Sequence, residues 1–312
     1  MKTIVIAIGG NSLIKDAKHQ SVPDQYAAVV ETVRHLTDLL ERHYRVVITH
    51  GNGPQVGFIL LRSEHSRGWL HGVPLDSIVA DTQGALGYQL QQALENEFRR
   101  RGLKNSVATI ITQTLVDRHD PAFTKPTKPI GEFYTCEQAA ERMQVEQWTM
   151  AEDAGRGWRR VVASPKPVRI IEAEVVRHLV KDGYVVVAAG GGGIPVVADA
   201  QGMLTGVPAV IDKDLASAVL ARQIGADLLV ISTSVEKVCR NFGTPEQQEL
   251  DSMTVAEAQN YAAAGHFAAG SMLPKIEACV HFIQGGGHAA VITCPAKLSL
   301  ALDGETGTRI LP

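Results

Sequence analysis

The sequence predicts an α/β fold in which helices cover both faces of a mostly parallel β-sheet, a three-layer αβα sandwich. Short apolar runs typical of buried strands alternate along the 312 residues with longer segments of helical periodicity. Glycine-rich turns follow three of these runs, as expected where a strand ends and a helix begins. We expect residues 1–312 to form one domain, with an N-terminal lobe over about 1–200 and a C-terminal lobe over about 201–312.

Composition and charge disfavour several classes of protein. The net charge of −3 and the absence of a basic tract give no reason to expect nucleic-acid binding. The four cysteines form no C-x-x-C pair, which favours reduced thiols over disulfides or a zinc site. No apolar run approaches the ~18 residues of a membrane span, and the first residues resemble a strand more than a signal peptide. We therefore expect a cytoplasmic protein that does not contact membranes.

The first third of the chain shows regular alternation. Proline at position 54 suits the first turn of a helix, and the apolar spacing around it supports one. The expected elements are a strand at 4–8, a helix at 24–43, a strand at 45–49, a helix from about 54, a long helix within 75–101 and a strand at 107–111.

Prolines then interrupt the pattern between residues 117 and 167. One helix is expected there, because Thr135 and Gln138 have the spacing of a capping box. A stretch of this length within a regular α/β chain indicates an inserted subdomain or lid.

Regular alternation resumes after the insertion. Asp214 is expected to cap a helix that ends at Gly225, and Thr254 with Glu257 forms a second capping box. The expected elements are a helix at about 168–181, strands at 184–189 and 228–232, a helix around Lys275 that ends at 285–287, and a last strand at 289–293.

The three glycine-rich segments indicate an anion site. The segments are Gly9-Gly10-Asn11, Gly51-Asn52-Gly53 and residues 190–193. Loops at the carboxyl ends of parallel strands gather at one edge, and glycine lets backbone N–H groups approach an oxyanion. We therefore predict a phosphate or carboxylate site at this edge.

Several familiar anion-binding motifs are absent. No glycine loop ends in G-K-[ST], and no G-x-S-x-G occurs, which disfavours a P-loop NTPase and a serine hydrolase. Gly51-x-Gly53 meets its next glycine at Gly57, one residue too late for a dinucleotide fingerprint. No cluster has metal-ligand spacing. A dehydrogenase is thus a minor alternative, which NAD(H) binding would test.

Three lysines are better placed for chemistry. Lys128, Lys213 and Lys275 lie in turns bounded by proline, glycine or aspartate, although a solvated surface is the usual place for a lysine. Phosphoryl transfer needs positioned positive charge, backbone amides and Mg²⁺ on the nucleotide more than covalent help from the protein. The three lysines and the glycine loops therefore favour a kinase without a Walker motif.

These motifs together resemble the carbamate kinases, a family with the amino-acid-kinase fold. The resemblance runs nearly end to end, and the segment Pro126–Gly131 separates this family from acetylglutamate and aspartate kinases, which place a lysine in the first glycine loop. It rests on residues 8–11, 50–55, 126–131, 190–195, 210–216 and 270–275.

The resemblance implies an eight-stranded sheet, a homodimer and reversible phosphoryl transfer between ATP and carbamate. Mg²⁺ would travel with ATP or ADP, and ATP synthesis from carbamoyl phosphate during catabolism, for example of arginine, would be the physiological direction. The carbamate side would lie in the N-terminal lobe and the nucleotide side in the C-terminal lobe.

The resemblance also implies residue roles. Lys128, Lys213 and Lys275 would hold the transferred phosphoryl group, with Asp214 orienting the lysines. The carbamate side would be lined by Gly9, Gly10, Asn11, Gly51, Asn52 and Gly53. The nucleotide would be bound by Gly191, Gly192, Asp212, Ser232, Val235, Lys237, Val238, Met272 and Lys275.

Two departures leave alternatives open. Ser12 stands where the family usually has alanine, and residues 80–84 differ from the usual Met-Ser-Gln-Gly. A related kinase acting on another small carboxylate or phosphate is therefore the main alternative. A non-catalytic module that only binds a nucleotide is a second.

Overall fold

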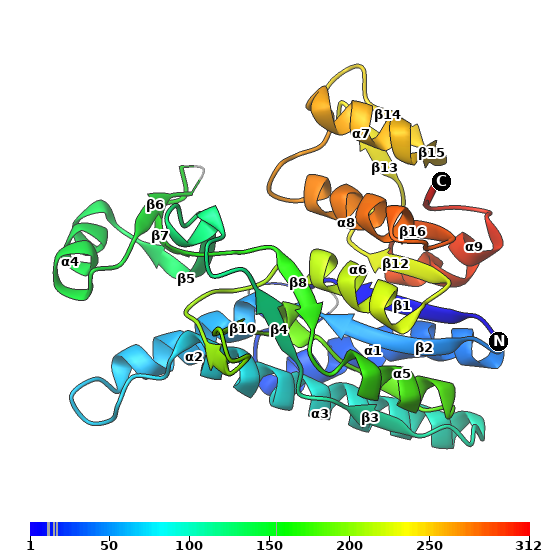
Figure 1. The fold of residues 1–312 in the computed structure, drawn as a ribbon, viewed down its shortest axis with the longest axis horizontal. Helices are drawn as coiled ribbons and strands as arrows, with labels where there is room; N and C mark the ends of the chain where they lie inside the picture. Colours follow the sequence, from blue (N-terminus) through cyan, green and yellow to red (C-terminus); the bar gives the residue numbers. More distant parts are fainter. Residues whose placement is uncertain (11–12, 15, 17, 154) are drawn as a thin grey trace.

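The computed structural model describes residues 1–10, 13–14, 16, 18–153 and 155–312, and its centre is an eight-stranded sheet (Figure 1). The strand order is β15-β17-β16-β12-β1-β2-β9-β3, and neighbouring strands are parallel except for β16 and β17. The strands are β1 (Thr3–Ile8), β2 (Arg45–His50), β3 (Val107–Thr109), β9 (Val185–Val187), β12 (Leu228–Ser232), β15 (Ser252–Thr254), β16 (Ala289–Thr293) and β17 (Thr308–Leu311).

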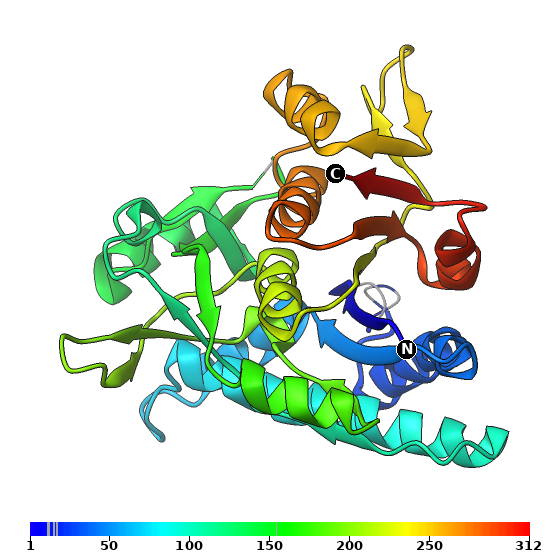
Figure 2. The same ribbon diagram turned by 45° about the vertical axis from the view of Figure 1, so that its right-hand side comes forward.

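Helices cover both faces of this sheet, as predicted. Side chains of β1 alternate between two cores: Ile4 and Ile6 face one, Val5 and Ala7 the other. The first core is closed by α1 (Val22–Glu41), α3 (Leu75–Arg101) and α9 (Leu298–Asp303), and the second by α5 (Ala173–Lys181), α6 (Lys213–Ile224), α7 (Val255–Ala263) and α8 (Met272–Gln284). Figure 2 shows these layers from a second direction.

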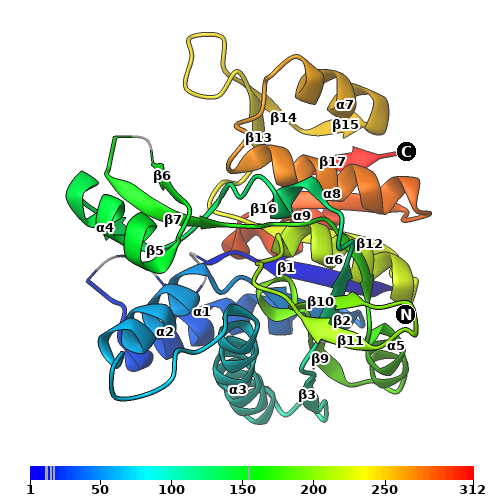
Figure 3. The ribbon, with the colours of Figure 1, turned by 60° about the vertical axis from the view of Figure 1, so that its left-hand side comes forward.

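The predicted insertion forms a subdomain that projects from the sheet (Figure 3). It contains a three-stranded sheet of order β5-β7-β6 and the helix α4, which Thr135 and Gln138 cap as expected. It comprises β5 (Lys128–Tyr134), α4 (Cys136–Glu146), β6 (Met150–Glu152) and β7 (Trp158–Val162), after the short helix η2 (Pro121–Phe123).

Two smaller sheets complete the described structure. They have the orders β11-β10-β4-β8 and β13-β14. The remaining elements are α2 (Gly53–His65), β4 (Gln113–Val116), β8 (Pro167–Ile170), η3 (Gly190–Gly192), β10 (Ile194–Ala198), β11 (Leu204–Gly206), β13 (Val238–Arg240), β14 (Gln248–Leu250) and η4 (Pro295–Lys297).

Two local predictions were wrong. The segment from Val168 to Ile170 is not helical but forms β8, because it pairs antiparallel with β4, more than fifty residues earlier, and local periodicity does not reveal such a partner. Asp214 is not the cap of α6: Asp212 has the extended cap conformation, and its side chain accepts from the backbone N–H groups of Asp214 and Leu215. The predicted end at Gly225 is confirmed, with φ of 67°.

In the part of the chain that the structure describes, no helix combines the length and apolar character needed to cross a membrane.

Candidate active site

The first two glycine segments meet at the carboxyl ends of neighbouring strands. β1 ends at Ile8 and β2 at His50, and the two strands lie side by side in the sheet. A Cβ on Gly51 would lie 3.4 Å from the Gly10 backbone nitrogen, and one on Gly9 would lie 3.3 Å from the Ser232 carbonyl oxygen. Glycine therefore allows these backbones to approach closely at the edge where the sequence predicts an anion site. Asn11 lies outside the described residues.

Lys128, Lys213 and Lys275 converge on one cavity of about 330 Å³, here called the phosphoryl cavity. Lys128 comes from the start of β5, and the other two come from the first turns of α6 and α8. The cavity is also lined by Gly51, Asn52, Gly53, Gly191, Asp212, Asp214 and Ser271. Residues from distant parts of the chain thus share one space.

Asp214 is the buried anion between two of these lysines. The residue is 3% exposed, accepts from Lys275 Nζ at 3.0 Å and pairs with Lys213 through its other oxygen. Burial alone raises the pKa of this carboxyl, but the two ammonium groups outweigh burial and hold the pKa below the ordinary 3.8. Asp214 therefore stays ionised and keeps both ammonium groups in the cavity.

Asp212 holds the third lysine. Its Oδ2 accepts from Lys128 Nζ at 3.1 Å, while Oδ1 accepts from the first N–H groups of α6. One carboxylate therefore ties the subdomain lysine to the helix that carries Lys213 and Asp214. The geometry pairs Asp212 as well as Asp214 with a lysine, whereas the resemblance implied such pairing for Asp214 alone.

The glycine run at 190–193 packs against the second glycine loop. Gly191 has φ of 66°, and a Cβ there would lie 2.0 Å from Asn52 Nδ2. Asn52 Nδ2 in turn donates to Thr82 Oγ1 at 2.9 Å. A Cβ on Gly192 would lie 2.5 Å from the Ile211 carbonyl oxygen. These glycines lie beside the phosphoryl cavity, so any nucleotide contact from them would be at the phosphate end.

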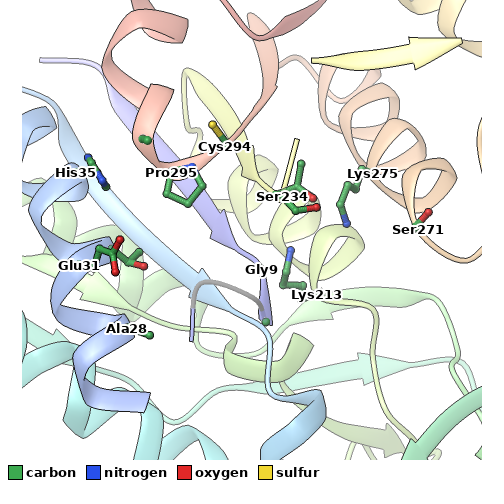
Figure 4. A pocket seen from close by; sticks show the side chains of 14 residues that line it. Gly9, Ala28, Glu31, His35, Lys213, Ser234, Ser271, Lys275, Cys294 and Pro295 are labelled. Carbon is green, nitrogen blue, oxygen red and sulfur yellow. The ribbon is translucent and has the colours of Figure 1, made fainter. Parts of the chain in front are cut away.

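Two further cavities adjoin the phosphoryl cavity, and all three share Ser271 and Lys275 in their linings. The larger, about 690 Å³, runs from Gly9 and Gly10 past Lys213 toward α1 and η4. In Figure 4 Lys213 and Lys275 lie close together at one end of it, with their ammonium ends converging. The smaller, about 200 Å³ and here called the distal cavity, is lined by Thr233, Ser234, Val235, Lys237, Cys239, Phe242, His266, Phe267, Ala268 and Met272.

Most of the residues predicted to bind the nucleotide line two different cavities. Val235, Lys237 and Met272 line the distal cavity, whereas Gly191 and Asp212 line the phosphoryl cavity. Ser232 and Val238 are fully buried and support the walls, with the Val238 N–H donating to Thr308 Oγ1 at 2.8 Å.

The chain as a whole matches a known family. A model of the amino acid kinase family matches residues 2–294. The chain belongs to the amino acid kinase family.

Its relatives within that family include carbamate kinases. The carbamate kinase-like protein YahI of Escherichia coli (strain K12) is 52% identical, over 99% of this chain and 98% of its own length. The carbamate kinase of Pyrococcus horikoshii is 46% identical over 99% of both chains. The structure of carbamate kinase from Giardia lamblia bound to AMP-PNP is 40% identical with a TM-score of 0.93, and the match covers 99% of this chain and 98% of that one.

Residues 80–84 of this amino acid kinase, which the resemblance singled out as a departure, support the site loops. Thr82 accepts from Asn52, and Gln83 Nε2 donates to the carbonyls of Thr112 at 3.0 Å and Gly190 at 3.1 Å. Sequence reasoning did not assign them this role. The available signal was two polar residues on an otherwise apolar helix face, between Val79 and Leu86. Ser12, the other departure, lies outside the described residues.

Proposed function

We propose that the protein is a carbamate kinase, which transfers a phosphoryl group reversibly between ATP and carbamate. The observation that carries the proposal is the convergence of Lys128, Lys213 and Lys275 on one cavity beside the glycine loops. Relatives named carbamate kinase, 46–48% identical over nearly their whole length, support the choice of carbamate as acceptor.

The cavities suggest how the substrates lie. The apolar walls of the distal cavity, including Val235, Phe267 and Met272, suit the adenine ring. The phosphates would then pass Ser271 and Lys275, which line all three cavities. Carbamate would lie at the opposite end of the phosphoryl cavity, against Gly51 and Asn52.

In the forward reaction an oxygen of carbamate attacks the terminal phosphorus of ATP, and the bond from that phosphorus to the bridging oxygen of ADP breaks. Carbamate is already an anionic nucleophile, so the protein supplies no general base. Lys213 and Lys275, fixed by Asp214, face the charge that spreads over the phosphoryl oxygens. Lys128 would leave Asp212 and contact the same oxygens.

The donor set suits a Mg²⁺ ion that enters on the nucleotide. Both oxygens of Asp214 are paired with lysines, and those of Asp212 contact Lys128 and the start of α6. In the described residues no group of three or more His, Cys, Asp or Glu side chains is arranged to hold a metal. Bound to phosphate oxygens, Mg²⁺ neutralises their charge and aligns them.

The physiological setting belongs to the same proposal. Carbamoyl phosphate is the higher-energy partner, so we expect ATP synthesis in a catabolic pathway, such as arginine breakdown, to be the favoured direction. Carbamate released in this direction decomposes to ammonia and CO₂. We also expect a cytoplasmic homodimer.

The direct test is ATP formation from ADP and carbamoyl phosphate in the presence of Mg²⁺. We expect turnover with carbamoyl phosphate to exceed that with acetyl phosphate or other acyl phosphates. Preference for another acyl phosphate would instead identify a related kinase. Calorimetric ADP binding without turnover on any acyl phosphate would contradict the assignment as an enzyme.

A further inference from the structure

The subdomain strand β5 and the helix α2 run side by side away from the phosphoryl cavity. Lys128 and Gly53 lie together at the cavity, and a Cβ on Gly57 would lie 3.4 Å from the Cα of Gly131 farther along. The helix rises about 18 Å from Asn52 to Glu64. The strand, which is irregular between Ile130 and Tyr134, spans at most about 20 Å from Lys128 to Tyr134. Their far ends therefore also coincide, well away from the lysines.

At these far ends, side chains of α2 and of the loop after it meet the subdomain in a cluster that we call the clasp. Arg142 Nη2 lies 3.6 Å from Glu64 Oε2, and the Tyr134 hydroxyl donates to the same oxygen at 3.4 Å. Arg67, just beyond α2, pairs with Glu146 of α4. The clasp comprises Glu64, Arg67, Tyr134, Arg142, Glu146 and Trp148.

Burial makes the clasp depend on its charge pairs. The side chain of Glu64 is only 6% exposed, and its Oε1 has no hydrogen-bond partner among the residues that the structure describes. Burial holds the pKa of Glu64 above its ordinary value, although the charges of Arg142 and Arg67 act in the opposite direction. The guanidinium of Arg142 also lies 5.4 Å from the centre of the Trp148 ring. Loss of Arg142 would leave the buried Glu64 carboxylate without its contacting cation, which is strongly unfavourable. Loss of the Glu64 charge would leave Arg142 paired with Glu146 of its own helix at 3.2 Å, and no longer with α2. Either change should therefore loosen the cluster.

At the cavity end the backbone is anchored, because Lys128 pairs with Val162 of β7 and the Val210 N–H donates to the Ala163 carbonyl at 3.0 Å. The side-chain contacts there are weaker. The side chain of Lys128 is 41% exposed. Among the described residues its Nζ makes one ion pair, with Asp212. Exposed ion pairs of this kind contribute little to stability. Leu60 of α2 and Ile130 of β5 belong to one buried apolar cluster, but apolar burial has no directional preference.

We propose that Glu64 and Arg142 are positioning residues, which hold β5 along α2 from its far end and thereby place Lys128 in the phosphoryl cavity. The inference rests on the proposed function, because it assigns the clasp to the delivery of a lysine needed for phosphoryl transfer. Neither side chain lines any of the three cavities of the site.

The test compares Glu64→Gln, Arg142→Gln and the double variant with Glu141→Gln. Glu141 is an exposed carboxylate on the same helix as Arg142 and has no ion pair in the described structure, so its variant is a matched control. Two quantities are measured for each protein: steady-state kinetics with ADP and carbamoyl phosphate, and hydrogen exchange of the β5 amides.

We expect each single variant to lower kcat about tenfold, the size of a lost charged contact, with the KM for ADP unchanged and faster exchange in β5. The double variant should be no worse than the more severe single one, because both changes open one clasp. Kinetics and exchange like those of Glu141→Gln would overturn the proposal. So would equal losses in kcat and in ADP affinity, which indicate general disruption.

Two further comparisons distinguish failure of this proposal from failure of the proposed function and from failure of a variant to fold. Hydrogen exchange needs no turnover, so a wild type inactive on carbamoyl phosphate would contradict the proposed function, while faster β5 exchange in Glu64→Gln would still support the clasp. If Glu64→Gln does not fold, Glu64→Asp retains the charge but lengthens the 3.6 Å contact, and the same two measurements decide.

Discussion

Asp214 shows how one buried residue can carry both stability and chemistry. Its carboxylate has almost no contact with solvent, and each of its oxygens faces an ammonium group. Removing one partner of a buried charge group usually costs more than the group contributed, because the remaining charges stay desolvated. Here the remaining charges would be the two lysines that we assign to phosphoryl transfer.

Asp214→Asn should therefore lower kcat on the order of 100-fold, as expected for loss of a preorganised electrostatic contact, and destabilise the fold by about 3 kcal/mol. Because the pKa of Asp214 is lowered in the folded state, its stabilising effect is present above the ordinary pKa and lost as pH falls below it. Urea unfolding at pH 7 and enzyme kinetics measure both effects. Exposed Asp182→Asn is the control, and equal behaviour of the two variants would refute the role of Asp214.

His50 makes the fold sensitive to acid. It is 1% exposed, and burial, opposed by its contact with the Gly51 carbonyl, lowers its pKa from 6.5 to about 4. The unfolded chain therefore binds a proton between pH 6.5 and 4 that the folded chain does not, so stability falls as pH decreases through this window. Between pH 7 and pH 5 the free energy of unfolding should fall by about 2 kcal/mol.

Urea unfolding at pH 7 and pH 5 tests this effect. The wild type and the exposed-site control His71→Gln should lose stability equally, whereas His50→Gln should lose about 2 kcal/mol less over the same interval. An unchanged pH dependence in His50→Gln would show that another group is responsible.

The turn at η3 is the element that most clearly needs glycine. A Cβ on Gly190 would lie 2.4 Å from His50 Nε2, and one on Gly191 would lie 2.0 Å from Asn52 Nδ2. Real Cβ atoms do not approach other atoms so closely, so a larger residue must displace the loop that faces the phosphoryl cavity. The turn thus acts through packing against the site loops.

Gly191→Ala should lower kcat at least tenfold, because misplaced site loops need to cost only about 1.4 kcal/mol of transition-state stabilisation to have this effect. The variant should also lower the midpoint of unfolding. Gly202→Ala is the control, because Gly202 also has positive φ, 81°, but open space around its missing Cβ. It should lose only about 1 kcal/mol of stability through backbone strain and keep full activity. If both variants kept full activity, the packing role of Gly191 would be wrong.

In the whole molecule, the site lies where the sheet edge, the start of α8 and the subdomain meet. The arrangement gives the lysines unequal surroundings. Lys275 lines all three cavities, whereas Lys128 lines the phosphoryl cavity alone among them. The two lysines should therefore differ in what their loss does to nucleotide binding.

Lys128→Ala should lower kcat on the order of 100-fold with little change in the KM for ADP, because its contact forms only with the transferred group. Lys275→Ala should lower kcat and also raise the KM for ADP several-fold. Steady-state kinetics and calorimetric ADP binding distinguish the two patterns. A weakened ADP affinity in Lys128→Ala would place this lysine on the nucleotide instead.

Much of the fold was predictable, because its signals are local. The bounds of α3, β12 and β16 match the apolar periodicity, and both capping boxes, at Thr135 and Thr254, are formed. The strand β8 was missed because its partner lies far away in sequence. The strand β17 was missed for the same reason, since its four residues pair with β15 and β16.

The sequence by itself determined the layers of the sheet, the interruption of the regular alternation after residue 117 and the residue types of the proposed anion site, because periodicity, turn chemistry and motif spacing are properties of neighbouring residues. Only the tertiary structure decided which carboxylate holds which lysine. Asp212 and Asp214 are nearly equivalent in sequence, but the first turn of α6 directs one toward Lys128 and buries the other between Lys213 and Lys275. Pairing between side chains that distant segments supply depends on geometry that no local pattern contains.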